Sequence, residues 1–143
     1  MNTLTAAAQA APYRDRKRYA WILSILVPAF AGSGAVLVMW TGDPRAAWLP
    51  VLFIYGLIPV LDLIMGEDRS NPPESAVPAL EADKYYRYVT YASVPVLWLS
   101  FIISVWFLAT HEMPWHAQLA LVLSAGFAGG FGINLGHELG HKN

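Results

Sequence analysis

The residues best suited to chemistry lie together in the stretch 137–141, which reads HELGH. It matches the pattern H-E-x-x-H, in which two histidines hold a metal ion and the glutamate acts as a general base. Residues four apart lie on one face of a helix, so His137 and His141 can bind the same ion. Imidazole binds zinc and iron alike, so the motif predicts a metal site without selecting the metal.

The residues beside this pair extend the same helical face. Asn134 lies three positions before His137, and Glu138 is rotated from it by about 100° and flanks the site. Further back, Gly126 and Gly130 allow close helix packing or leave room for a ligand. An ionisable cluster at the end of an uncharged apolar stretch is costly without a partner, so it indicates a functional site.

The composition predicts that these residues are carried by membrane-spanning helices. The chain is 56% hydrophobic and 13% charged, whereas soluble domains carry about 25% charged residues. Four apolar stretches, about 19–40, 46–65, 88–110 and 117–136, have the roughly 20-residue length that a spanning helix needs. We therefore expect an all-α, polytopic transmembrane protein with an N-terminal segment over 1–18 and a transmembrane domain over 19–143.

The basic residues predict how the chain is oriented. Of the nine lysines and arginines, only Arg45 lies between the first and second or the third and fourth apolar stretches. The side of a membrane protein that carries the excess of Lys and Arg is cytoplasmic. The N-terminus, the long connection 66–87 and the HELGH stretch are therefore expected in the cytoplasm. The net charge of -1 argues against a nucleic-acid partner, and the absence of cysteine excludes thiolate metal ligands.

Several motifs occur in an order that resembles a known family. They are DRKRY at 15–19, PVLD at 59–62, GEDRSNPPE at 66–74, KYYR at 84–87 and NLGHELGHK at 134–142. Together they resemble the N-terminal portion of the bacterial membrane alkane hydroxylases, within the wider family of membrane histidine-box di-iron hydroxylases and desaturases. The coupling of GEDxxNPPE to NxGHELGHK is far more specific than HExxH alone.

This resemblance implies an activity, cofactors and partners. Such enzymes hydroxylate the terminal methyl of medium-chain alkanes with O2 at two irons, on the cytoplasmic side of the inner membrane. Their electrons come from rubredoxin, which an NADH-dependent rubredoxin reductase reduces. The matching positions make His137 and His141 iron ligands, and by analogy Asn134 and Glu138 would orient their imidazoles.

An alkane offers no polar group to recognise, so an apolar tunnel open to the lipid is expected. Its candidate lining residues lie on the second and fourth spans: Ile54, Leu57, Leu61, Gly126 and Gly130.

Two alternatives stay open. One is a related histidine-box enzyme, either a xylene-type hydroxylase or a desaturase. The other is a protein of a different class. It is either a membrane zinc peptidase of the HExGH type, for which Asp62 is a conceivable third ligand, or a non-catalytic membrane segment that kept the motif.

The family fold that the resemblance implies is larger than this sequence, and the difference affects the expected activity. The family has about six spans and further histidine boxes of the HxxHH type, which this sequence lacks. We therefore expect an N-terminal fragment, inactive alone, because two histidines cannot ligate two irons. His111 and His116 fall in the opposite turn, match no box, and are expected to be ordinary interfacial residues.

Overall fold

A computed structural model of the chain describes residues 13–66 and 72–141, with His141 described by its backbone alone. Residues 67–71 of the GEDRSNPPE motif, Lys142 and most of the segment 1–18 lie outside the described residues. The described residues form helices and turns without any strand. The all-α prediction is therefore confirmed.

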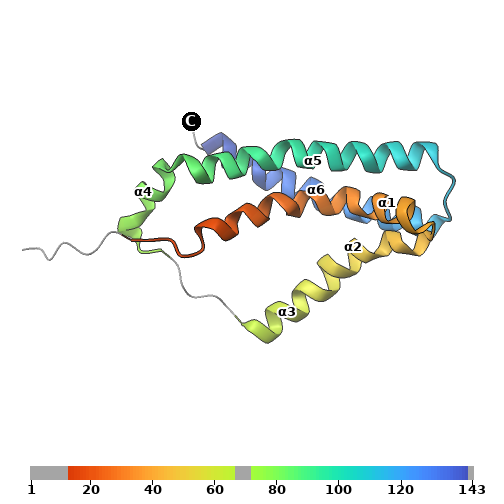
Figure 1. The fold of residues 1–143 in the computed structure, drawn as a ribbon, viewed down its shortest axis with the longest axis horizontal. Helices are drawn as coiled ribbons and strands as arrows, with labels where there is room; N and C mark the ends of the chain where they lie inside the picture. Colours follow the sequence, from red (N-terminus) through yellow and green to blue (C-terminus); the bar gives the residue numbers. More distant parts are fainter. Residues whose placement is uncertain (1–12, 67–71, 142–143) are drawn as a thin grey trace, which may run out of the picture.

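Four helical segments are long and apolar enough to cross a membrane (Figure 1), as expected. The first span joins η1 (Arg18–Ala29) to α1 (Phe30–Thr41), and the second joins η2 (Pro44–Trp48), α2 (Leu49–Leu52), η3 (Phe53–Leu57) and α3 (Ile58–Met65). The third is α5 (Lys84–Thr110) and the fourth is α6 (Trp115–His141). The short helices η4 (Glu74–Ala76) and α4 (Val77–Ala82) precede α5.

The turn between the first two spans follows from local sequence. Gly42 ends α1 in the left-handed conformation, with φ of 69°, which glycine adopts without steric cost. Asp43 then caps η2, because its carboxylate accepts a hydrogen bond from the backbone N–H of Arg45 at 2.9 Å. Pro44 fits the first position of that helix, where its missing N–H costs nothing.

The second span changes its helical geometry in its middle. The backbone forms a π-helical turn over Phe53–Leu57, and Pro59 follows it. Proline has no N–H to donate to the carbonyl of Tyr55, four residues before it, so a regular α-helical ladder is interrupted here. In Figure 1 the second span diverges from the other three, and among the described helices α3 packs against none beyond the adjoining η3.

Small residues bring the other three spans together. A Cβ on Gly32 would lie 2.9 Å from the Cα and from the carbonyl oxygen of Ser100, so α1 and α5 touch through their backbones. The buried Ser104 Oγ donates a hydrogen bond to the carbonyl of Ala31 at 2.7 Å. Close approach through Gly, Ala and Ser replaces the hydrophobic driving force that helices lack in lipid.

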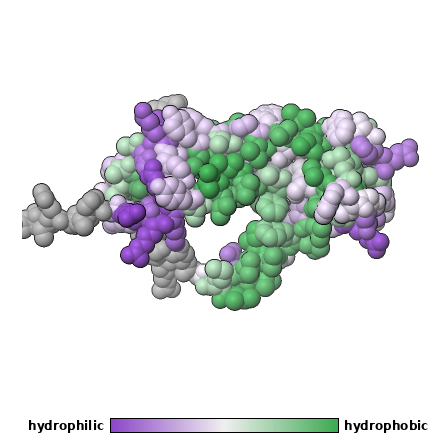
Figure 2. Space-filling view, in the orientation of Figure 1, coloured by the Kyte–Doolittle hydropathy of each residue, from purple (hydrophilic) through white to green (hydrophobic). Residues whose placement is uncertain are grey.

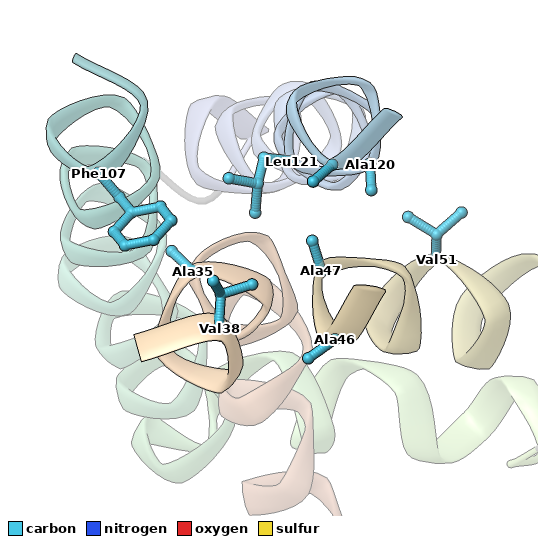
Figure 3. Close-up of a cluster of buried hydrophobic side chains, with 9 residues drawn as sticks. Ala35, Val38, Ala46, Ala47, Val51, Phe107, Ala120 and Leu121 are labelled. Carbon is cyan, nitrogen blue, oxygen red and sulfur yellow. The ribbon is translucent and has the colours of Figure 1, made fainter. Parts of the chain in front are cut away.

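A cluster of buried hydrophobic side chains lies toward the turns that follow α1 and α5. Figure 3 shows Phe107 of α5 and Leu121 of α6 pointing toward small residues of the first two spans. The buried cluster comprises Ala35, Val38, Ala46, Ala47, Val51, Phe107, Ala117, Ala120 and Leu121.

The two ends of the bundle differ from its middle in hydropathy. Figure 2 shows hydrophobic surface along the helices and hydrophilic surface gathered at both ends. Figure 1 shows the start of η1, α4 and the carboxyl end of α6 at the same end of the bundle. Of the residues expected to share one side of the membrane, the described start of η1, α4 and the HELGH turns lie at one end of the structure.

Candidate metal centre at the end of α6

The HELGH stretch lies on the last turns of α6, which continues unbroken from Trp115 to His141. The side chain of Leu135 is buried, whereas Asn134, His137 and Glu138 are exposed. Leu135 therefore faces the bundle and fixes the rotation of the helix, while the polar residues point away from the packed core. The backbone places His137 and His141 one turn apart, in the register that lets two imidazoles bind one ion.

Within residues 13–66 and 72–141, no three His, Asp or Glu side chains gather into a metal-binding group. Asp62, the third ligand considered for zinc, lies on α3, which packs against no part of α6. The structure therefore does not bring Asp62 to the histidine pair. His137 and His141 remain the candidate ligands, and they supply two donors of a larger set.

The other two histidines lie at the opposite end of the bundle. The His111 ring stacks on Phe107, with ring centroids 4.2 Å apart, and its Nδ1 lies 2.8 Å from Thr110 Oγ1. His116 packs edge-to-face with Trp115, with ring centroids 6.1 Å apart. That both are ordinary interfacial residues stays a prediction.

An apolar groove of about 440 Å³ runs between α5 and α6 and reaches the helical turn that carries His137. Such a volume lies within the range of about 300–1,000 Å³ for ligand sites. No charged side chain lines it. Its lining residues are Val94, Leu97, Trp98 and Phe101 of α5 and Ala128, Gly129, Gly132, Ile133, Leu135, Gly136 and Leu139 of α6.

The residues expected to line a tunnel are not brought together by the described structure. Ile54 is buried and its neighbour Tyr55 packs edge-to-face on Phe127, with ring centroids 6.3 Å apart. Leu57 and Leu61 are exposed, and a Cβ on Gly126 or Gly130 would meet nothing within 4 Å. None of the five expected residues lines the groove between α5 and α6.

Sequence reasoning missed the α5 side of this groove. On α6 the spacing of Gly129, Gly132 and Gly136 at three and four residues was a usable signal for a small-residue face. Nothing in the sequence of α5 marks Trp98 or Phe101 as partners of that face, because apolar residues lie on every side of the helix beyond Arg87.

Four spanning helices with paired histidines at the end of one of them define a polytopic helical membrane protein with a candidate metal site. No family model matches the chain. It is 48% identical over 130 residues to alkane 1-monooxygenase 1 of Alcanivorax borkumensis, covering 91% of this chain and 32% of that protein. It is 46% identical over 133 residues to the alkane 1-monooxygenase of Ectopseudomonas oleovorans, covering 93% and 33%.

A third relative extends the match over nearly the whole chain. The alkane 1-monooxygenase of Pseudomonas putida is 43% identical over 143 residues, covering 99% of this chain and 36% of that protein. The chain thus spans about a third of the length of these curated relatives. The resemblance to the alkane hydroxylases expected from the motifs is confirmed.

Proposed function

We propose that this chain forms part of a membrane monooxygenase that converts a medium-chain alkane and O2 to a 1-alkanol. The observation that carries the proposal is the pair His137 and His141, four residues apart at the end of α6, a spanning helix that on another face lines an apolar groove. The relatives named alkane 1-monooxygenase support it over nine-tenths of the chain. None of the three relatives described above is named as a peptidase, which disfavours the zinc alternative.

The donor chemistry of the site fits iron. His137 and His141 would each contribute one imidazole nitrogen, and imidazole is a good ligand for iron. Two such donors are fewer than one iron requires, so further ligands complete a di-iron centre. Asn134 and Glu138, exposed on the flanks of the same turns, would hold the imidazoles in orientation through hydrogen bonds.

The reaction needs an external reductant to balance. Alkane, O2, two electrons and two protons give the alcohol and water, with one oxygen atom in each product. When bound, the irons would supply the activation of O2. We propose rubredoxin as the electron donor, itself reduced by an NADH-dependent reductase, on the cytoplasmic face of the inner membrane.

The groove between α5 and α6 would hold the alkyl chain. Its lining has no charged group and offers aromatic and aliphatic contacts from Trp98, Phe101 and Leu97. Alkanes partition into the bilayer, and a groove between two spanning helices admits them from the lipid. Leu135 and Leu139 line the groove on the helical turns that bear the histidines. The terminal methyl group of an alkane in the groove would therefore lie at the metal end.

The proposal is tested with a chimera, since the chain matches about a third of its relatives. The matching third of the Ectopseudomonas oleovorans enzyme is replaced by this chain, and octane conversion is assayed with iron, rubredoxin, its reductase and NADH. We expect 1-octanol from the chimera and none after His137→Ala or His141→Ala. The matched controls His111→Ala and His116→Ala remove histidines from the opposite end and should retain activity. Loss of activity in the controls, or activity without His137, would contradict the assignment.

A further inference from the structure

A basic rim surrounds the start of η1 and α5, at the end of the bundle that also carries the HELGH stretch. Six cationic side chains form it: Arg14, Arg16, Lys17, Arg18, Lys84 and Arg87. The two helices are joined there by side-chain contacts between residues far apart in sequence. The guanidinium of Arg18 forms an ion pair with Asp83 and lies 4.5 Å from the centre of the Tyr85 ring.

The carboxylates within this rim are already occupied by donors. Asp83 accepts from Arg18 Nη2 at 3.1 Å and from the backbone N–H of Tyr85 at 2.9 Å. Asp15 accepts from the hydroxyl of Tyr86 at 2.6 Å and from the indole N–H of Trp21 at 3.2 Å. These two carboxylates therefore stabilise the contact between η1 and α5.

Four of the cations keep their charge uncompensated. Among the residues the structure describes, Arg14, Arg16, Lys84 and Arg87 form no ion pair. The first three are exposed, and the half-buried Arg87 keeps its Nε without a hydrogen-bond partner. With Glu74, Glu81 and Glu138 also counted, the described residues at this end of the bundle hold six cations and five carboxylates.

The rim lies at the level of a membrane surface. Exposed aromatic side chains stand next to it: Tyr19 and Tyr88 are 78% and 62% exposed. Such residues are enriched at the headgroup level of spanning helices. From Tyr88 to the end of α5 at Thr110 the helix rises about 33 Å, which matches the roughly 30 Å hydrocarbon core.

The opposite interface offers no comparable charge. It carries exposed Trp40 and Trp115, and its one arginine, Arg45, is held to Asp43 at 3.2 Å. The four cations without an ion pair thus lie at one interface, in the plane where lipid phosphates lie.

We propose that the basic rim is a binding site for the headgroup of an anionic phospholipid. Arginine forms charge-assisted, often bidentate hydrogen bonds with phosphate. The exposed tyrosines pack beside the glycerol and upper acyl chain, while the apolar flanks of η1 and α5 receive the acyl tails. An acidic protein surface would satisfy the charges but leave the aromatic belt and the adjoining apolar flanks without a partner. The site is independent of the proposed metal centre.

The test uses the chain purified in neutral detergent, titrated with phosphatidylglycerol or phosphatidylcholine of identical acyl chains and followed by native mass spectrometry. Each cation near an anionic headgroup is worth about a five-fold change in affinity, so phosphatidylglycerol should bind at least about five-fold more tightly. The triple variant R14Q/R16Q/K84Q should reduce that preference to within about two-fold of unity. All three side chains are exposed, and far-UV circular dichroism verifies that the variant keeps its helices.

The matched control is Arg45→Gln, which removes a cation from the opposite interface and should leave the preference unchanged. Equal affinity for the two lipids in the unaltered chain, or a preference that survives the triple substitution, would overturn the proposal. Equal lipid affinity would point instead to an acidic protein as the occupant. Displacement of phosphatidylglycerol by glycerol 3-phosphate at equal concentration would identify a soluble phosphate ligand and equally contradict a lipid site.

Discussion

The contact between α1 and α5 predicts a specific cost for one added methyl group. In Gly32→Ala the new Cβ would lie 2.9 Å from the Cα and carbonyl oxygen of Ser100. Both are backbone atoms, so no side-chain rotation relieves the overlap and the helices must separate. Overpacking of this kind costs about 1–3 kcal/mol. Separation also stretches the hydrogen bond from Ser104 to Ala31, worth about 0.6 and up to roughly 1.7 kcal/mol in membrane proteins.

A control at a second glycine isolates the steric contribution. A Cβ on Gly126 would meet nothing within 4 Å, so Gly126→Ala removes only the helix penalty of glycine, about 0.5–1 kcal/mol. We expect it to leave stability unchanged or slightly raised. Because both substitutions exchange the same residue types in a spanning helix, their difference measures the clash with Ser100.

The assay is reversible unfolding in mixed micelles of dodecyl maltoside and sodium dodecyl sulfate, followed by tryptophan fluorescence and far-UV circular dichroism. Gly32→Ala should shift the midpoint to lower sodium dodecyl sulfate, and Ser104→Ala should do so by a smaller amount. Equal stability of Gly32→Ala and the unaltered chain would refute the backbone contact. Equal destabilisation by Gly126→Ala would refute the steric explanation.

Three further predictions follow from the ends of the bundle and the groove. Hydrogen bonding from Tyr86 lowers the pKa of Asp15, and hydrogen bonding from Arg18 lowers that of Asp83, both from 3.8. The stability that the two carboxylates contribute is therefore fully present above their unfolded-state pKa and is lost as the pH falls through their folded-state pKa. The sodium dodecyl sulfate midpoints of unfolding at pH 6 and pH 3 should differ less in Asp83→Asn than in the unaltered chain. In the active chimera, Gly129→Phe should block the groove and lower kcat/KM for dodecane about ten-fold more than for hexane, and equal losses for both alkanes would place the substrate elsewhere. The 143-residue chain by itself, supplied with iron, rubredoxin, its reductase, NADH and octane, should produce no 1-octanol, because two imidazoles cannot hold two irons.

The class of protein was accessible from the sequence, which also predicted a candidate place for its chemistry. Long uncharged stretches of spanning length specify helices in lipid, because every backbone polar group must be paired within the segment. The spacing of His137 and His141 on an uninterrupted helix, together with the ordered motifs, predicted the candidate metal site and the resemblance to the alkane hydroxylases. The exact limits of the spans and the roles of the candidate ligands stay predictions.

The tertiary structure alone decided which helix faces meet. In a soluble helix the apolar stripe identifies the buried face, but lipid-facing and helix-facing sides of a spanning helix are equally apolar. The sequence therefore could not show that Gly32 meets Ser100, or that Trp98 and Phe101 line a groove beside the HELGH turn. Nor could it show that α3 leaves the bundle and carries Leu61 and Asp62 away from α6. Helix partners in lipid are chosen by the close fit of small residues across two surfaces, and that fit exists only when both surfaces are present.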